Sequence, residues 1–209
     1  GLAECEIALG HLAHRSDSMS LAQTRAERAL AMMHELRNPR GEAACLRLLA
    51  MIALDTADLR KSRDHALSAS SLYAEMGEPR GHVEASLVLA QVALAANKPV
   101  AADLIRACES VGLAEAETRQ HLLLSKSWLA YTEGRREDAQ SDLEAARQCF
   151  RDTRSSGDHT RQLLARLAEL GWPKYERKLI EDWRTELGAQ IRRRDTPVKE
   201  EKRADQHDA

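Results

Sequence analysis

The stretch Asn38-Pro39-Arg40-Gly41 recurs as Glu78-Pro79-Arg80-Gly81, 40 residues further along the chain. The ten-residue segments that begin at the two glycines share a pattern as well: 41–50 read GEAACLRLLA and 81–90 read GHVEASLVLA. A fixed spacing between similar segments indicates a repeat architecture, in which each repeat buries its apolar face against its neighbours. The chain is therefore predicted to be built from units of about 40 residues.

Two further copies flank this pair. Moving back 40 residues aligns Cys5 with Cys45 and Leu9 with Leu49. A fourth copy follows at a shorter offset, and it departs from the others at Lys126, which stands at the register of Leu9 and Leu49. We predict four units, at 1–40, 41–80, 81–117 and 118–157.

The composition of the 209 residues predicts that the units are helical. The chain has only 11 Ile plus Val and 7 aromatic residues, which are the residue types that sheets need. Ala, Leu, Glu, Arg and Gln are abundant instead, and these residues favour helices. Each unit divides into two helices around a short break, with second helices expected at 21–36, 59–76, 100–111 and 136–152.

Small residues recur at matched positions in the predicted helices. Small side chains let two helix backbones approach closely, so recurrence in four copies predicts four matched crossings. The first helices carry Gly10, Ala50, Ala90 and Ser127 at one register, and the second helices carry Ala22, Ser62, Ala101 and Ala139. A four-helix bundle with chance similarity is the alternative, but a bundle does not require a repeat of this length.

This pattern resembles the tetratricopeptide repeat (TPR), a helix–turn–helix unit with small residues at its helix crossing. The resemblance covers about 1–157, and the long unit is similar to that of bacterial multidomain regulators. It implies an all-α, right-handed α-solenoid of about ten helices. The family's aromatic positions are mostly alanine here, as at Ala26 and Ala66.

The pattern changes after the fourth unit. Two helices are expected within 158–192, separated by Gly171 and Pro173. A solenoid exposes the apolar face of its last repeat, so we predict that these helices form a cap, with Tyr175, Leu179 and Trp183 as the covering residues. The charged segment 193–209 is expected to be disordered.

Several classes of function are disfavoured by what the sequence lacks. Charges nearly cancel, to a net −2, so neither nucleic acid nor a membrane surface is an expected partner. No catalytic motif, phosphate-binding loop or metal-ligand cluster stands out, so we expect no enzyme, cofactor or metal. His11 and His14 have helical i, i+3 spacing but lack a third ligand.

Targeting signals are missing as well. No apolar run is long enough to span a bilayer, and the acidic N-terminus does not resemble a signal peptide. The cysteines at 5, 45, 108 and 149 are too widely spaced for disulfide or zinc patterns, and buried, reduced thiols are expected. We predict a cytoplasmic protein. Gly1 is either a cloning remnant or the cut edge of a longer protein.

The concave groove is the candidate site. By register with the TPR family, the first helices would line it. Trp128 and Tyr131 are three residues apart and share a helix face, so they are expected to anchor a partner, unless Trp128 packs in the core. The predicted groove residues are His11, His14, Arg15, Arg47, Met51, Gln91, His121, Leu124, Trp128 and Tyr131.

The leading functional hypothesis is a non-catalytic scaffold that binds a protein or peptide segment in this groove, as part of a larger protein. The partner could equally be another domain of the parent chain. Two alternatives stay open: a sensory or effector-binding domain of an ATPase-linked or kinase-linked transcriptional regulator, and a self-assembly domain that forms a homo-oligomer.

Overall fold

The computed structural model describes residues 1–112, 115–153 and 160–195. This part of the chain contains ten α-helices and no strand, which confirms the all-α prediction. The helices are α1 (Leu2–Arg15), α2 (Met19–Glu35), α3 (Pro39–Asp55), α4 (Leu59–Glu75), α5 (Pro79–Ala95), α6 (Val100–Ser110), α7 (Ala116–Thr132), α8 (Arg136–Thr153), α9 (Thr160–Glu169) and α10 (Lys174–Asp195).

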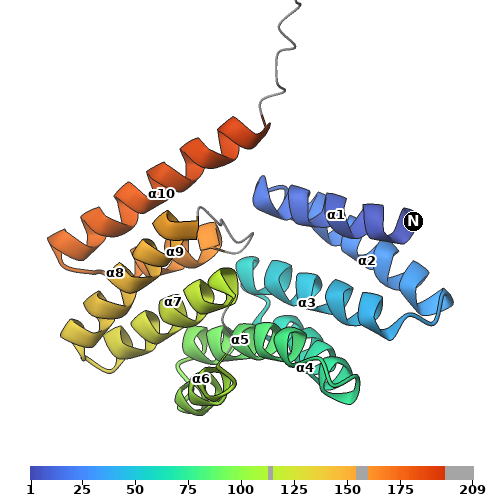
Figure 1. The fold of residues 1–209 in the computed structure, drawn as a ribbon, viewed down its shortest axis with the longest axis horizontal. Helices are drawn as coiled ribbons and strands as arrows, with labels where there is room; N and C mark the ends of the chain where they lie inside the picture. Colours follow the sequence, from blue (N-terminus) through green and yellow to red (C-terminus); the bar gives the residue numbers. More distant parts are fainter. Residues whose placement is uncertain (113–114, 154–159, 196–209) are drawn as a thin grey trace, which may run out of the picture.

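Consecutive helices pack as antiparallel pairs in a solenoid-like arrangement. The pairs α1/α2, α3/α4, α5/α6 and α7/α8 correspond to the four predicted units, and each packs on the next. Figure 1 shows that they follow an arc, with α1 and α10 facing each other across its open side. The first helix of each unit, an odd-numbered helix from α1 to α7, lies toward the inside of the arc.

The turns between helices recur every 20 residues. A left-handed backbone conformation occurs at Asp17, Arg37, Ala57, Gly77 and Asn97, each just after a helix. Three residues after each of these helices ends, a backbone N–H closes the turn onto the last helical turn, as in Ser18 N to Ala13 O (2.8 Å) and Asp58 N to Ala53 O (2.8 Å). The 40-residue unit therefore consists of two 20-residue halves.

The prolines of the repeated joint begin helices. Pro39 and Pro79 are the first residues of α3 and α5, where a missing N–H is not needed. The Asn38 side chain accepts a hydrogen bond from Gly41 N (3.0 Å) and caps α3. The helices of units two and three thus start two residues before the predicted boundaries at 41 and 81.

Small residues lie at buried helix crossings, as predicted. Ala50 is fully buried, and Ser62 of α4 donates a hydrogen bond to its carbonyl (2.7 Å). Ser127 of α7 donates to the carbonyl of Ala139 in α8 over the same distance (2.7 Å). A hydroxyl that reaches a backbone carbonyl of the partner helix requires the close approach that small side chains permit.

The helices α9 and α10 cover the fourth unit. Trp183 of α10 is fully buried, and its ring centroid lies 5.8 Å from that of Phe150 in α8. Leu179 is half-buried against the same cluster. Tyr175, which was predicted to cover the last unit, is exposed; its hydroxyl donates to Glu144 Oε1 (3.3 Å) on the outer surface of α8.

Two sequence predictions meet the structure only in part. The tail predicted over 193–209 lies outside the described residues from 196 onward, while α10 includes 193–195. The prediction of four buried cysteines is wrong for Cys5, which is exposed. Cys45 and Cys108 are buried, and Cys149 is half-buried.

Candidate functional site

The inner side of the arc is occupied by the chain's own α9 rather than left as an open groove. Thr160 at the start of α9 donates to Gln120 Oε1 in α7 (2.9 Å). Gln162 Nε2 donates to the His14 carbonyl in α1 (3.2 Å), and Arg166 donates to the Leu54 carbonyl in α3. Helix α9 therefore contacts the first helices of units one, two and four.

Two different faces hold α9 in place. Leu163, Leu164 and Leu167 are fully buried in a cluster with residues of α7, α8 and α10. The polar side chains of Gln162 and Arg166 reach toward α1 and α3 instead. The apolar face therefore attaches α9 to the C-terminal half of the arc, while polar contacts join it to the N-terminal half.

The predicted groove residues are distributed under this helix and between units. Five of them are buried: His14, Met51, Gln91, Leu124 and Trp128. The other five are half-buried: His11, Arg15, Arg47, His121 and Tyr131. The structure thus does not present the set as an open surface.

Trp128 is a core residue, which resolves the alternative that the sequence left open. Its side chain is 5% exposed and lies in one cluster with Leu124 and Leu163. Tyr131 packs its ring on Trp172, which follows α9, with centroids 4.1 Å apart. The expected surface anchor at Trp128 and Tyr131 is therefore covered by α9 and the segment after it, and truncation of Trp128 should destabilise the fold.

A buried polar cluster joins units one and two to α9. His14 Nε2 lies 2.7 Å from Asp55 Oδ2, and both side chains are almost inaccessible to solvent. Arg166 Nη2 lies 3.4 Å from the other carboxylate oxygen of Asp55. The described residues contain no group of three or more His, Cys, Asp or Glu side chains arranged for a metal ion. These contacts therefore join α1, α3 and α9 across the concave side.

Arg47 pairs with a neighbouring unit and is not available as a free charge. Its guanidinium lies 3.4 Å from Glu84 Oε2 in α5, and Arg80 Nε lies 2.9 Å from Glu84 Oε1. Burial by itself would raise the pKa of Glu84, but Arg47 and Arg80 outweigh it and lower that pKa below its usual value. The ionised carboxylate thus links units two and three.

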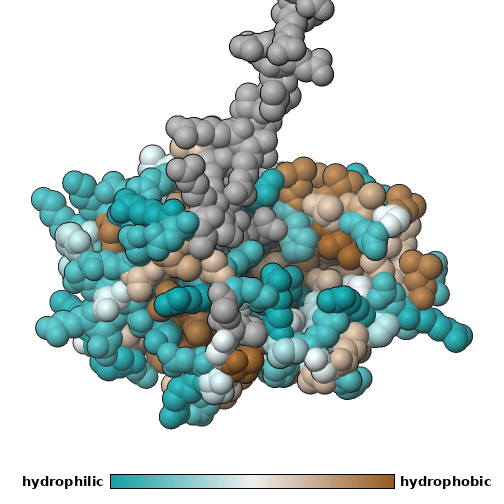
Figure 2. Space-filling view, in the orientation of Figure 1, coloured by the Kyte–Doolittle hydropathy of each residue, from teal (hydrophilic) through white to brown (hydrophobic). Residues whose placement is uncertain are grey.

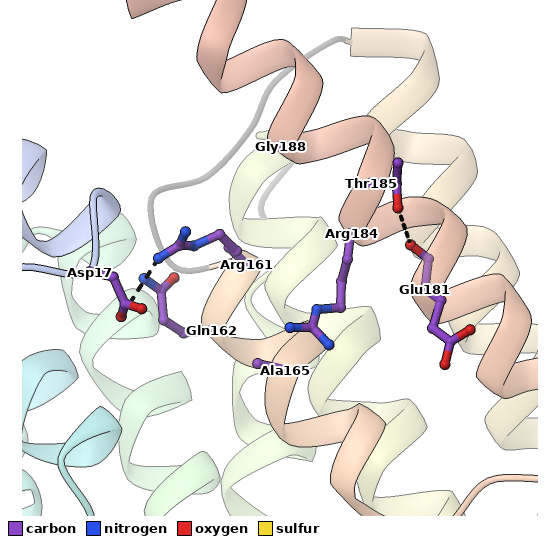
Figure 3. Close-up of a pocket in the computed structure, with 8 residues that line it drawn as sticks. All are labelled: Asp17, Arg161, Gln162, Ala165, Glu181, Arg184, Thr185 and Gly188. Carbon is purple, nitrogen blue, oxygen red and sulfur yellow. Dashed lines mark hydrogen bonds and ion pairs between the residues drawn. The ribbon is translucent and has the colours of Figure 1, made fainter.

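An open cleft remains where α9, α10 and the turn after α1 meet, and we call it the α9–α10 cleft (Figure 3). Its volume is about 490 Å³. Arg161 lies 3.6 Å from Asp17 across the cleft, and Arg184 extends from α10 toward Ala165 of α9. The cleft is lined by Asp17, Arg161, Gln162, Ala165, Glu181, Arg184, Thr185 and Gly188.

The two arginines differ in how firmly they are held. Arg184 is exposed and makes no hydrogen bond or ion pair with the described residues. Arg161 has one long ion pair, to the exposed side chain of Asp17. This site was not predicted, because the segment after the fourth unit was expected only to form a cap.

No protein-family model, curated protein or solved structure matches this chain. The helical repeat is therefore supported by the internal similarity of the sequence and by the arrangement of the helices. Within the described residues, none of the helices combines the length and apolarity needed to span a membrane.

Proposed function

We propose that this chain is a non-catalytic protein-interaction module of the TPR type that holds an acidic segment of another protein in the α9–α10 cleft. The observation that carries the proposal is the pair of guanidinium groups, Arg161 and Arg184, on two different helices that line one open cleft. Guanidinium groups bind carboxylates through paired hydrogen bonds, so two of them on facing helices suit adjacent acidic side chains.

The shape of the cleft favours a protein segment over a small effector. Sites for small molecules are enclosed and mainly apolar, with a few polar groups that fix orientation. The α9–α10 cleft is open to solvent along the surface, and six of its eight lining residues are polar or charged. An extended peptide segment can bind in such a cleft without being enclosed by it.

The polar pairs elsewhere in the fold support a role other than catalysis. A hydroxyl nucleophile needs a neighbouring base and a site that admits substrate. Ser70 lies 3.0 Å from His82 Nδ1, and Thr160 lies 3.2 Å from His121 Nε2. Both hydroxyl residues are buried between packed helices, and neither pair lines the α9–α10 cleft.

A peptide-display selection tests the proposal. The purified protein is panned against a random peptide library, and enriched sequences are measured by fluorescence anisotropy. We expect acidic peptides whose affinity falls at least roughly 10-fold in the double variant Arg161→Ala/Arg184→Ala, since charge-assisted hydrogen bonds contribute about 1.5–3 kcal/mol each. Binding should also weaken with added salt.

The control is Arg106→Ala, which removes an exposed arginine from α6, on the opposite side of the arc from α10. This variant should bind the selected peptides like the parent. Melting curves of all variants should coincide within a few degrees, because the cleft arginines are not part of the core. Peptides without acidic residues, or equal binding by the double variant, would place the binding site elsewhere.

A further inference from the structure

One face of α1 is apolar and bare. Leu2, Cys5, Leu9 and Leu12 follow helical i, i+3, i+7, i+10 spacing, so they form one line along the helix, which we call the α1 stripe. All four are exposed, Leu9 and Leu12 at 44% each. Figure 2 shows apolar side chains gathered over the part of the surface where α1 and α2 lie in Figure 1.

The same register is buried in units two and three. Leu49 and Leu89, which correspond to Leu9, are 4% and 8% exposed. Ile52 and Val92 correspond to Leu12, and Cys45 corresponds to Cys5; all three are buried as well. The α1 stripe is therefore the counterpart of a packed surface and has no cover in the described chain.

The preceding unit supplies that cover elsewhere in the solenoid. The Cα of Gly41 in α3 faces the side chain of Met33 in α2, and that of Gly81 in α5 faces the ring of Tyr73 in α4. Cys45 shares a buried cluster with Met33. The α1 stripe is thus one half of a unit-to-unit interface.

Unit four keeps the contact with different chemistry. Lys126 of α7 stands at the register of Leu9, and its ammonium lies 2.9 Å from Glu109 Oε1 in α6, the second helix of the preceding unit. An ion pair replaces the apolar contact there, and the hydrogen bond to Glu109 raises the pKa of Lys126. Each later unit therefore contacts its predecessor at this register, whether by leucine or by an ion pair.

We infer that the α1 stripe pairs with the α1 stripe of a second copy of this chain. The stripe is symmetric about Ile7: in an antiparallel pair of α1 helices, Leu2 opposes Leu12 and Cys5 opposes Leu9. Every apolar side chain of the stripe then meets another one. The same patch on both copies gives a closed twofold dimer.

The other end of the solenoid favours this head-to-head arrangement over a chain of copies. The face of α10 that points away from the core is charged, with Arg177, Lys178, Glu181 and Asp182 exposed. A head-to-tail contact would bury these charges against leucines, which is unfavourable. Pairing through the α1 stripes leaves α10 and the α9–α10 cleft in solvent.

Sedimentation analysis of the 23.3 kDa chain tests the inference over a range of concentrations. The parent should approach twice the monomer mass and no more. Leu9→Glu/Leu12→Glu should weaken dimerisation at least roughly 100-fold, because it would bury four carboxylates in one interface. Leu67→Glu, at an equally exposed leucine of α4, should dimerise like the parent. Both variants should keep the parental circular-dichroism spectrum.

Disulfide trapping tests the geometry. Leu9→Cys places a thiol opposite Cys5 of the second copy, so mild oxidation should give a covalent dimer on a non-reducing gel. Leu67→Cys is the matched control and should stay largely monomeric. A parent that is monomeric at every concentration, that grows beyond a dimer, or that dimerises equally well with Leu9→Glu/Leu12→Glu would overturn the proposal.

Discussion

The first and last units of the described solenoid differ in whether their outer apolar faces are covered. At the C-terminal end, α10 places Ile180, Trp183 and Leu187 on the last unit, and all three are fully buried. At the N-terminal end, Leu9 and Leu12 stand at a register that is packed in later units, yet they remain exposed. A repeat unit cannot bury its outer apolar face alone, so each end needs a cover.

This difference predicts where stability resides. Removing side chains from the covered end creates cavities and exposes core, which is costly. Removing side chains from the bare end deletes surface that is already in water, so it has little effect on the isolated chain. The same substitution should therefore have unequal consequences at the two ends.

The largest effect is expected from removal of the cap. Deleting residues 173–209 would expose the cluster that contains Phe150, Leu163 and Leu167. The shortened protein should aggregate, because a contiguous apolar surface would face solvent. Light scattering and the yield of soluble protein measure this outcome.

Deletion of 196–209 alone is the control for that truncation. It removes a charged segment and leaves the whole of α10. This shorter chain should melt within a few degrees of the parent. If both truncations behave alike, α10 does not stabilise the last unit.

A single substitution sharpens the role of α10. Trp183→Ala should lower the free energy of unfolding by about 3–5 kcal/mol, since it removes a fully buried ring. Tyr175→Ala, on the exposed side of the same helix, is the matched control and should cost less than about 1 kcal/mol. Chemical denaturation followed by circular dichroism distinguishes the two, and equal losses would show that α10 packs through a different face.

Crossings inside the solenoid should respond with smaller losses. Ala50 and Ala90 are fully buried at matched registers, so Ala50→Leu or Ala90→Leu would overpack them. Each is expected to cost about 1–3 kcal/mol in thermal or chemical unfolding. A variant that melts like the parent would mean that its crossing is loose and that the register is misassigned.

Much of the fold could be predicted from the sequence, because particular residue types recur at matched positions of the repeat. The Pro-Arg-Gly joint and the matched small residues locate the units and their crossings. The 20-residue spacing of the turns was not visible, because the left-handed positions carry Asp17, Arg37, Ala57 and Asn97 as well as glycine. Glycine is the usual mark of a left-handed position after a helix, and among these five positions only Gly77 carries it.

The candidate site was harder to predict. A register taken from single units says which side of a helix faces inward, but not what fills the space. Helix α9 has apolar residues on one face and Gln162 and Arg166 on the other, which reads equally well as an ordinary surface helix. The return of α9 to α1 and α3 depends on polar contacts more than 100 residues apart in sequence, such as Arg166 with Asp55.

The smallest effect is expected in the reactivity of the cysteines, which can be measured on the protein without any substitution. Burial raises the pKa of Cys45 and of Cys108 to about 11, whereas Cys5 lies exposed on the α1 stripe. The thiolate attacks a thiol reagent, so Cys5 should react first in the folded protein at pH 8, at a concentration where the chain is monomeric, and the two buried thiols only after unfolding. Loss of the fast phase in Cys5→Ser confirms the assignment, and four equal rates in the folded state would contradict it.

The central claim is that one register is packed in unit two but exposed in unit one. The most direct test is the same Leu→Ala substitution at that register in both units. Leu49→Ala should lower the free energy of unfolding by about 2–5 kcal/mol, because Leu49 is packed between units one and two. Leu9→Ala, measured at a concentration where the chain is monomeric, should cost less than about 1 kcal/mol. A difference of this size between the two variants is the predicted result, and equal losses would contradict the account.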